Sequence, residues 1–288
     1  MPSLREVLKQ AEANHVAVGH FNFSDLTAFN AIVAAARELQ LPVLVGVSEG
    51  EREFVGVAQA AALVKAIRDE YGYPIFLNAD HTHSLAKAEA AAKAGFDEII
   101  FDGSALPFEE NIKQTKQAIE AVKSINPAVL VEGEIGWIGS SSELLDKVPQ
   151  GVGVLTTPEE ARHFVEATKV DVLAPAVGNM HGMLESMVHG GVHKQLHIGT
   201  IAQIKAAAGI FMTLHGGSGT GDEDFKRAIK AGMTIVHVNT ELRLAWRQGI
   251  EEGLAAEPNE VAPYKILPAA VEAVRKVVSS RLELFNSK

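Results

Sequence analysis

Eight short apolar runs recur along the whole chain, and a longer amphipathic segment separates each run from the next. The runs are rich in β-branched residues and mostly apolar on both faces, which is typical of parallel strands covered by helices. In the intervening segments apolar residues recur every three or four positions, and Gly95, Gly209 and Gly232 stand where helices are expected to end. We expect strands at residues 16–22, 42–48, 74–80, 98–103, 128–134, 170–178, 210–216 and 234–239.

Eight strand–helix units predict an α/β protein, a (β/α)8 TIM barrel closed by right-handed crossovers. An open doubly wound sheet is the alternative, but it requires a Gly-rich dinucleotide turn after the first strand, where "HFNFSD" (20–25) stands instead. No linker-like stretch divides the chain, so we expect one domain over residues 1–288. Within it we expect a mobile functional loop near 136–157 and a C-terminal helix near 268–285.

The composition excludes several classes of function. A formal net charge of −10 argues against broad electrostatic binding of nucleic acid or an anionic membrane, so we expect neither partner. The chain has no cysteine, which excludes disulfides, thiolate metal sites and cysteine nucleophiles. No apolar run approaches the roughly 20 residues that span a bilayer, and the first 15 residues read as a polar-faced helix. We therefore expect a cytoplasmic protein whose metal ligands, if any, are His, Asp and Glu.

Polar or ionisable residues stand at the end of nearly every expected strand, and in a parallel barrel these ends share one rim, where catalytic groups lie. Three of them, His81, His181 and His215, come from different strands, so they can converge across the mouth of the barrel. Three imidazoles with one open position are a common catalytic zinc arrangement. The remaining residues at these ends are Asn22, Ser48, Asp80, Asp102, Glu132, Glu134, His237 and Asn239.

Other histidines compete for the same role. His83 forms an "HTH" pair with the residue two positions earlier, which resembles the metal-binding pair of zinc hydrolase barrels. In those barrels the pair usually follows the first strand, whereas here it follows the third. His189, His193 and His197 have a four-residue spacing that could line a helix, but the glycines at 190–191 weaken that helix. We expect a solvated loop there.

Two Gly-containing turns are suited to phosphate. "HGGSG" (215–219) follows an apolar strand and precedes an expected helix, so Gly216, Gly217 and Ser218 offer backbone amides and a hydroxyl at a helix N-terminus. Gly182 provides a second small turn directly after His181. In many barrels phosphate lies at the loops after strands 7 and 8, which is where the first turn falls.

Together these residues resemble the class II, metal-dependent ketose-bisphosphate aldolases, which include the fructose-bisphosphate and tagatose-bisphosphate aldolases. The similarity covers almost the whole chain. The most specific pieces are Asp80-His81, "VEGEIG" (131–136), His181-Gly182, "LHGGSG" (214–219) and "NTEL" (239–242), in that order.

The resemblance implies a metal centre and its acid/base group. His81, His181 and His215 would bind the catalytic divalent cation, commonly zinc, and Asp80 would act on the hydroxyl at the scissile bond. Asp102 and Glu134 match an accessory or alternative site, which could take a second divalent or a monovalent cation. Glu132 belongs to the same motif and would orient a ligand imidazole.

The resemblance also implies the residues that meet the substrate. Gly182, Gly216, Ser218 and Thr240 match phosphate-binding positions, beside Gly217 of the same turn, and Asn22, Ser48 and Asn239 would face the ketose. Arg243, Arg247 and Arg281 are candidates for the distal phosphate.

The chain departs from the family pattern in three places, one of which is the unusually His-rich loop from 183 to 197. His237 stands where the family usually has a substrate-contacting Asn. The catalytic Glu of the family's mobile loop aligns near Ser142, with Glu143 one position later, and we take Glu143 as the catalytic candidate.

The implied reaction is reversible, metal-dependent cleavage of a ketose 1,6-bisphosphate, with fructose 1,6-bisphosphate as the expected substrate. The products would be dihydroxyacetone phosphate and an aldehyde phosphate such as glyceraldehyde 3-phosphate, in glycolysis and gluconeogenesis. The charge left by cleavage can be absorbed by a lysine Schiff base or by a metal, and no expected strand ends in a buried lysine. Open alternatives are a tagatose-bisphosphate or other phosphorylated-ketose aldolase, a metal-dependent hydrolase, and a non-catalytic sugar-phosphate binding barrel. The family's members imply a homodimer or homotetramer.

Overall fold

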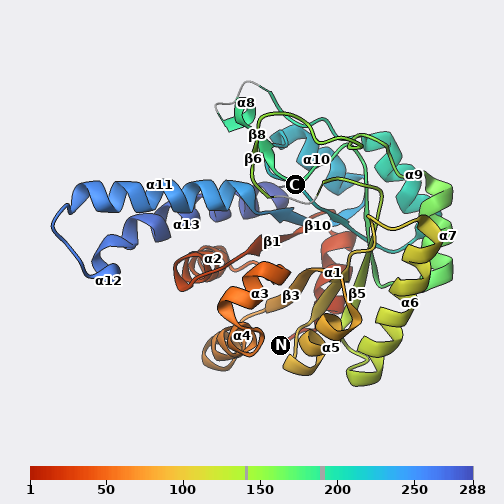
Figure 1. The fold of residues 1–288 in the computed structure, drawn as a ribbon, viewed down its shortest axis with the longest axis horizontal. Coiled ribbons are helices and arrows are strands. Elements are labelled where there is room, and N and C mark those ends of the chain that lie inside the picture. Colours follow the sequence, from red (N-terminus) through yellow and green to blue (C-terminus); the bar gives the residue numbers. More distant parts are fainter. Residues whose placement is uncertain (140–141, 189–191, 288) are drawn as a thin grey trace.

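The computed structural model describes residues 1–139, 142–188 and 192–287. Eight parallel strands form a closed barrel in the order β1-β10-β9-β7-β5-β4-β3-β2, with helices around it (Figure 1). This confirms the predicted (β/α)8 barrel. The barrel strands are β1 (Val18–Asn22), β2 (Val43–Val47), β3 (Ile75–Thr82), β4 (Glu98–Phe101), β5 (Leu130–Ile135), β7 (Val172–Pro175), β9 (Phe211–Leu214) and β10 (Met233–Val238).

The helices begin and end at residues that the sequence makes suitable for it. Ser3 and Thr157 form capping boxes, and Gly95 and Gly209 end helices in the left-handed conformation that glycine adopts freely. The helices are α1 (Leu4–Ala13), α2 (Leu26–Leu39), α3 (Glu49–Val55), α4 (Val57–Tyr71), α5 (Leu85–Ala94), α6 (Phe108–Ile125), α7 (Pro158–Thr168), α8 (Glu185–Val188), α9 (Ile198–Ala208), α10 (Asp222–Lys230), α11 (Thr240–Ala256), α12 (Pro263–Ile266) and α13 (Pro268–Phe285).

The interior of the barrel is apolar at one end and polar at the other. The first inward residues of seven strands form an apolar layer, and the buried face of α1 packs against this layer and covers that end of the barrel. Leu4 and Leu8 are among the helix residues in this contact. Two positions further along the strands, the inward side chains include His20, Asn78 and Glu132, all fully buried. The polarity of the interior therefore increases towards the carboxyl ends of the strands.

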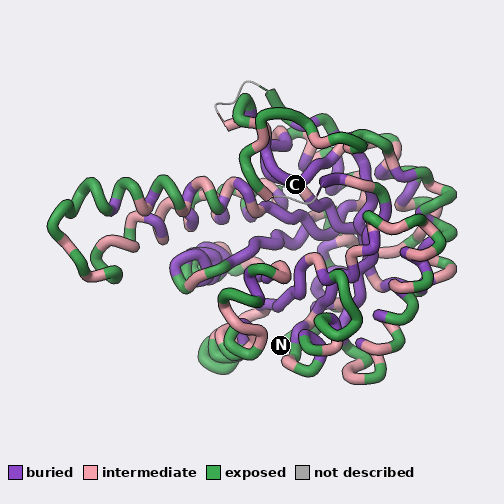
Figure 2. The backbone as a smooth tube through the Cα atoms, in the orientation of Figure 1, coloured by how far each residue is buried: buried purple, intermediate pink, exposed green. Residues whose placement is uncertain are grey.

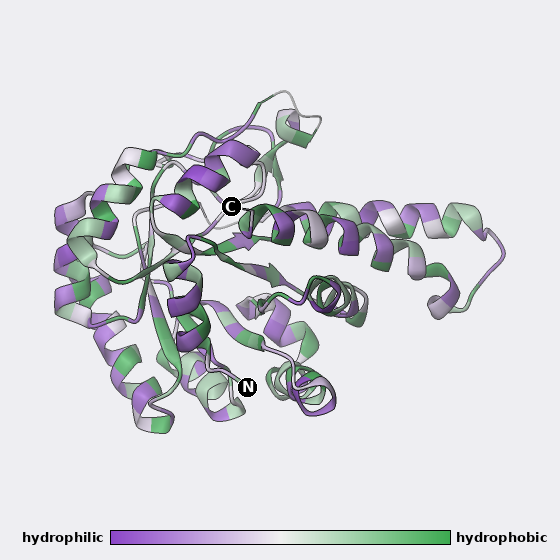
Figure 3. Cartoon of the chain, turned by 180° about the vertical axis from the view of Figure 1, so that it is seen from behind, coloured by the Kyte–Doolittle hydropathy of each residue, from purple (hydrophilic) through white to green (hydrophobic). Residues whose placement is uncertain are grey.

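Helices α11 and α13 lie side by side and extend away from the barrel, with α12 at the far end (Figure 1). We refer to these three helices as the arm. Buried residues are concentrated in the strands and on the helix faces that cover them, whereas much of the arm is exposed (Figure 2). Viewed from behind, hydrophobic residues dominate the strands and alternate with hydrophilic ones along the helices (Figure 3). No helix of the described residues is long and apolar enough to cross a membrane.

A second, two-stranded sheet lies outside the barrel, where β6 (Leu144–Leu145) pairs with β8 (Met183–Leu184). It joins the long connection after β5 to the connection after β7. The amide of His181 also donates to Ile138 O over 2.8 Å, which adds another link between the two connections. The segment expected to be a mobile loop thus contains ordered backbone contacts, while residues 140–141 lie outside the described part of the chain.

Candidate active site

Asp80 and His81 are adjacent in sequence, yet both side chains face the mouth of the barrel. In a regular strand neighbouring side chains point to opposite faces. Here the register between β3 and β4 shifts between Ala79 and Thr82, and His81 has a left-handed φ of 37°. A bulge of this kind re-aims a side chain at a functional site. Buried Arg52 holds it by donating to Asp80 O over 3.1 Å and to Thr82 Oγ1 over 3.0 Å.

The rings of His81, His181 and His215 meet at this mouth. Their ring centroids are 4.7 Å apart for His81 and His181, 4.8 Å for His81 and His215, and 5.8 Å for His181 and His215. One ring nitrogen of each lies within 4.8 Å of the other two. The structure therefore brings together three imidazoles from three different strand ends.

Each of these histidines uses its other ring nitrogen for a contact with the protein. Nδ1 of His81 lies 2.9 Å from Asp102 Oδ2, and Nδ1 of His181 lies 2.7 Å from the carbonyl oxygen of Gly139. Nε2 of His215 lies 2.8 Å from Glu132 Oε1. A carbonyl oxygen only accepts, so Nδ1 of His181 carries the proton and Nε2 keeps its lone pair. The nitrogens left to bind a metal are therefore Nε2 of His81, Nε2 of His181 and Nδ1 of His215. The contacts at the other nitrogens are of the kind that orient histidine ligands at metal sites.

The electrostatics favour a cation here. Burial alone would lower the pKa of His81, but Asp80, Asp102 and Glu134 raise it well above its usual value. Burial lowers the pKa of His181 and of His215 to about 3, so both stay neutral, as ligands must be. The carboxylates that hold a proton on His81 would equally favour a metal cation, and His81 would release that proton when its Nε2 binds the metal.

The spacing of two of these nitrogens also suits zinc. Nε2 of His81 and Nε2 of His181 are 3.2 Å apart. Two zinc–nitrogen bonds of about 2.1 Å at a tetrahedral angle would separate the nitrogens by about 3.4 Å. The donor set therefore fits a divalent metal. Glu134 Oε2 lies 3.6 Å from Nδ1 of His81, the ring nitrogen that also contacts Asp102. This trio is an alternative cation site, which requires the lone pair of the neutral ring to be on Nδ1 rather than on Nε2.

Asp80 is buried beside the three histidines. Asn22 Nδ2 donates to Asp80 Oδ2 over 2.8 Å, and Oδ1 lies 3.6 Å from Nε2 of His81 and 3.8 Å from Nδ1 of His237. Burial alone would raise the pKa of Asp80, but the charge of His81 and the hydrogen bond from Asn22 lower it below the usual value. Asp80 is thus held as a carboxylate with one oxygen free of hydrogen bonds among the described residues.

His20 belongs to this site, although the sequence analysis did not identify it. Its ring stacks on that of His237, with centroids 3.4 Å apart and planes 3° apart, and His237 in turn lies 4.1 Å from the His215 ring. Burial lowers the pKa of His20 to about 4 and that of His237 well below normal, so the pair is neutral. Period-two alternation back from Asn22 would have placed His20 inside the barrel.

The turns proposed for phosphate lie next to the histidines. Gly182 and Gly216 have φ values of 74° and 59°, which favour glycine. Ser218 Oγ accepts from the amides of Asn239 and Glu241 over 3.3 Å each, so the hydroxyl lies at the start of α11. The amide of Gly217 donates to His237 O over 3.0 Å and is therefore engaged within the protein rather than free for a ligand.

A cleft collects most of the predicted residues at the barrel mouth. Its lining residues are Asn22, Asp80, His81, Ser142, His181, Gly182, His215, Gly216, Ser218, His237, Asn239 and Thr240. An adjoining cavity of about 290 Å³ adds Ser48, Asp102 and exposed Glu143. Ser142 and Glu143 thus both lie at the site.

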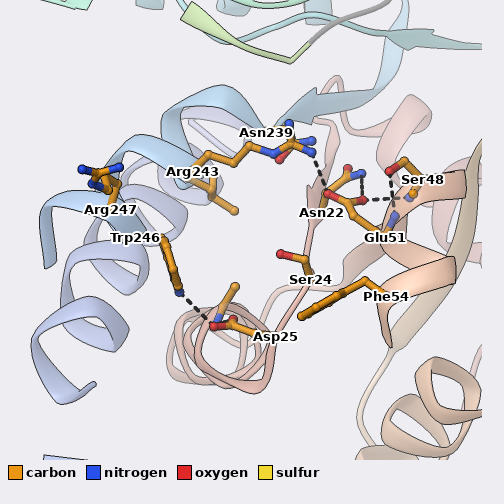
Figure 4. Close-up of a pocket in the computed structure, with 13 residues that line it drawn as sticks. Asn22, Ser24, Asp25, Ser48, Glu51, Phe54, Asn239, Arg243, Trp246 and Arg247 are labelled. Carbon is orange, nitrogen blue, oxygen red and sulfur yellow. Dashed lines mark hydrogen bonds and ion pairs between the residues drawn. The ribbon is translucent and has the colours of Figure 1, made fainter. Parts of the chain in front are cut away.

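A larger cavity of about 490 Å³ lies between α2, α3 and α11 (Figure 4). Arg243 and Arg247 of α11 lie on one side of it, and Arg243 reaches Glu51 Oε1 over 2.9 Å and the carbonyl oxygen of Ser142 over 3.1 Å. Arg281 lies elsewhere and is occupied by Glu241 and Asp222. Of the three arginine candidates, Arg243 is the one next to the cleft.

The other histidines of the sequence are not part of the cluster. The side chain of His83 is 57% exposed, and its Nδ1 lies 3.1 Å from the carbonyl oxygen of Asp102. His193 and His197 are exposed, and His189 lies outside the described residues. The sequence predicts a solvated loop here. The connection is only partly solvated, because Lys194 and Leu196 are buried.

Comparisons with known proteins match the chain over nearly its full length. The profile of the class II fructose-bisphosphate aldolases matches residues 2–288. The fructose-bisphosphate aldolase of Geobacillus stearothermophilus is 34% identical over 288 residues, which cover 99% of this chain and 96% of that protein. That of Staphylococcus epidermidis is 32% identical over 288 residues, covering 99% and 97%. The structure of the YdjI aldolase from Escherichia coli K12 has a TM-score of 0.82 at 25% identity, covering 98% of this chain and 96% of that one.

Proposed function

The chain belongs to the class II fructose-bisphosphate aldolases, which are metal-dependent lyases, and we propose that its substrate is fructose 1,6-bisphosphate. Cleavage would give dihydroxyacetone phosphate and glyceraldehyde 3-phosphate, and the reverse condensation would serve gluconeogenesis as cleavage serves glycolysis. The observation that carries the proposal is the convergence of three histidines beside one buried carboxylate, Asp80.

We propose zinc as the metal, held by Nε2 of His81, Nε2 of His181 and Nδ1 of His215. When bound, it supplies a Lewis acid that polarises the ketose carbonyl and stabilises the charge left by carbon–carbon cleavage. Asp102, Gly139 and Glu132 fix the ring orientations through the hydrogen bonds described above.

Asp80 is proposed to take the proton from the hydroxyl at the scissile bond and to return it during condensation. Its low pKa keeps it ionised, and the bond from Asn22 fixes one oxygen so that the other faces the cleft. Glu143, exposed at the cleft, is proposed to protonate the carbon freed by cleavage.

The substrate is proposed to span the mouth of the barrel. Gly182, Gly216, Ser218 and the start of α11 at Thr240 would bind the phosphate nearer the metal. Asn22, Ser48, His237 and Asn239 would contact the sugar, and Arg243 would meet the distal phosphate.

The proposal is tested by coupling triose phosphate release to a dehydrogenase, with purified protein and fructose 1,6-bisphosphate. We expect cleavage that a chelator abolishes and zinc restores, with one zinc per chain by mass spectrometry. A protein that binds zinc and sugar phosphate but cleaves neither fructose 1,6-bisphosphate nor tagatose 1,6-bisphosphate would instead be a non-catalytic barrel.

The same assay with tagatose 1,6-bisphosphate distinguishes the sugars. His237, next to Asp80, stands where the resemblance predicts a substrate-contacting Asn. The ratio of kcat/KM for the two substrates should therefore differ between His237→Asn and the wild type. A kcat/KM that is higher for tagatose 1,6-bisphosphate in the wild type would contradict the proposed substrate. Hydrolysis in place of cleavage would favour the hydrolase alternative, although His83 points out of the metal cluster.

We further propose a homodimer or homotetramer. The arm carries exposed Leu254 and Tyr264, and exposed Val261 lies in the connection between α11 and α12. Exposed apolar side chains of this kind pair at subunit interfaces. Analytical ultracentrifugation tests this, and a monomer at micromolar concentration would refute it. The cytoplasmic location stays a prediction.

A further inference from the structure

Lys194 is a buried lysine to which the proposed reaction assigns no role. It is 5% exposed and lies in the connection between α8 and α9. Its backbone is fixed by the bond from its amide to Gly219 O, at 3.0 Å, in the turn after β9. Its side chain extends behind the two turns that are proposed to bind phosphate.

The Nζ atom of Lys194 donates to three backbone carbonyl oxygens. The distances are 2.6 Å to Met180 O, 2.6 Å to Gly182 O and 2.8 Å to Gly216 O. Met180 and Gly182 are the two neighbours of His181, and Gly216 follows His215 directly. Lys194 therefore holds the backbone on both sides of one proposed metal ligand and next to another. We call the three oxygens the carbonyl site.

The same three peptide groups use their amides to bind other parts of the mouth. Each has its oxygen on Lys194 and its N–H on a carbonyl of the β5 connection or of β10. A cation at the oxygen end polarises the peptide and strengthens the bond at the N–H end. The amide bonds are His181 N to Ile138 O at 2.8 Å, Met183 N to Glu143 O at 2.9 Å, and Gly217 N to His237 O at 3.0 Å.

Lys194 must be charged to make these contacts. Three donated hydrogen bonds require three N–H groups, which only the ammonium form has. Burial lowers the pKa of Lys194 to about 7, and the charge of Glu241 acts in the opposite direction. Hydrogen bonds from the ammonium to three carbonyl oxygens also favour the charged form. With all three N–H groups engaged, this amine is not available as a Schiff-base nucleophile.

A cage of backbone carbonyls is also what binds a bare monovalent cation, because carbonyl oxygens replace its hydration shell. We propose that the Lys194 ammonium acts as a built-in monovalent cation, which positions the turns that carry His181 and His215 and adds positive charge behind the phosphate. The effect on phosphate rests on the proposed function. The ability of the carbonyl site to hold a free monovalent cation in place of the Lys194 ammonium does not.

The test is to remove the side chain and supply a free cation. In buffer whose only monovalent cation is tetramethylammonium, which is too large for the site, Lys194→Ala should raise the KM for fructose 1,6-bisphosphate at least tenfold. Ammonium or rubidium should restore KM to within threefold of wild type. Wild type should respond to neither ion. Lys194→Met, which fills the site with an uncharged chain, should lose affinity without rescue.

A readout independent of catalysis separates this proposal from the proposed function. Anomalous diffraction of Lys194→Ala crystals in rubidium should show the ion between Met180 O, Gly182 O and Gly216 O, and rubidium should raise the Tm of this variant alone. Lys123→Ala is the matched control, because Lys123 also donates to a carbonyl, Val129 O at 2.6 Å, but at the other end of the barrel. It should gain no rubidium response.

Absence of rubidium from the carbonyl site of folded Lys194→Ala, or an equal cation response in the wild type, would overturn the proposal. A further outcome is that the wild type cleaves no ketose bisphosphate while rubidium still occupies the carbonyl site of Lys194→Ala and tightens its binding of inorganic phosphate. In that case the cation role stands and the proposed function fails.

Discussion

Replacing Glu132 with glutamine tests how the protein prepares His215 to bind a metal. Glu132 is fully buried and uses both carboxylate oxygens, since Oε1 accepts from His215 Nε2 over 2.8 Å and Oε2 accepts from Thr213 Oγ1 over 2.6 Å. Glutamine has only one acceptor oxygen. That oxygen can still face His215, because the Thr213 hydroxyl can rotate and accept from the new amide. The variant therefore keeps the ring orientation and loses mainly the negative charge.

The size of the loss follows from the bond that changes. A hydrogen bond to a charged group contributes about 1.5–3 kcal/mol and a neutral one about 0.5–1.5 kcal/mol. The midpoints of these ranges differ by about 1.25 kcal/mol, which corresponds to about eightfold in zinc affinity. Glu132→Leu removes both acceptors and leaves the His215 tautomer unfixed, so its affinity should fall by about 100-fold, the upper end for second-sphere changes.

Burial raises the pKa of Glu132 to about 8, which adds a pH signature. Below pH 8 the wild-type carboxyl must release its proton before it can accept from the metal-bound imidazole, so wild-type zinc affinity falls as the pH drops. Glutamine carries no such proton. The ratio of wild-type to Glu132→Gln affinity should therefore be largest at pH 8.5 and should shrink towards pH 6.5.

The assay is zinc competition against a fluorescent chelator at both pH values, with circular dichroism to verify folding. Thr213→Val is the matched control, because it leaves the bond from Glu132 to His215 in place, and its zinc affinity should stay within about threefold of wild type. Equal zinc affinity in wild type and Glu132→Gln at pH 8.5 would refute the reasoning, as would a ratio that grows as the pH falls.

Three further outcomes are expected. Asp80→Asn should lower kcat for fructose 1,6-bisphosphate by about 10²–10⁴-fold with zinc content unchanged, and near wild-type turnover would disprove the acid/base role. His83→Ala should keep zinc content and kcat, since this ring lies outside the cluster, and zinc loss by mass spectrometry would contradict that placement. Asp171→Asn should lower the free energy of unfolding at pH 7 by about 2 kcal/mol. Burial alone would raise the pKa of Asp171, but Lys123, the Val131 amide and Arg5 lower it, so its stabilisation holds above the unfolded pKa and disappears as the pH falls through the folded one. Urea denaturation at pH 7 and pH 3 should show the gap between wild type and variant narrowing at the lower pH.

The rim residues were predictable because two local rules determine them. Parallel strands of a barrel end at one rim, and alternation fixes which side chains face inward. Asn22, Asp80 and His215 follow both rules, so sequence position alone brings them together. The direction of His81 does not follow from alternation, because it depends on the bulge in β3 and on Arg52, which holds that bulge from α3.

Lys194 and His20 were missed for different physical reasons. The burial of Lys194 is decided by three backbone carbonyls from other connections, and backbone groups leave no pattern in the sequence. It also stands among glycines and histidines that read as a solvated loop. His20 lies in the middle of an apolar strand, and its role appears only when His237, more than 200 residues later, stacks on it in the adjacent strand.

The helix that covers the base of the barrel makes the cleft a blind pocket. Since Leu4 and Leu8 fill that end with hydrocarbon, the cleft formed by the described residues opens on the opposite side, at the carboxyl ends of the strands. The product that binds deeper in the cleft would leave last, because a product bound nearer the mouth would block its path. The order of product release would then depend on the depth at which each product binds as well as on its affinity.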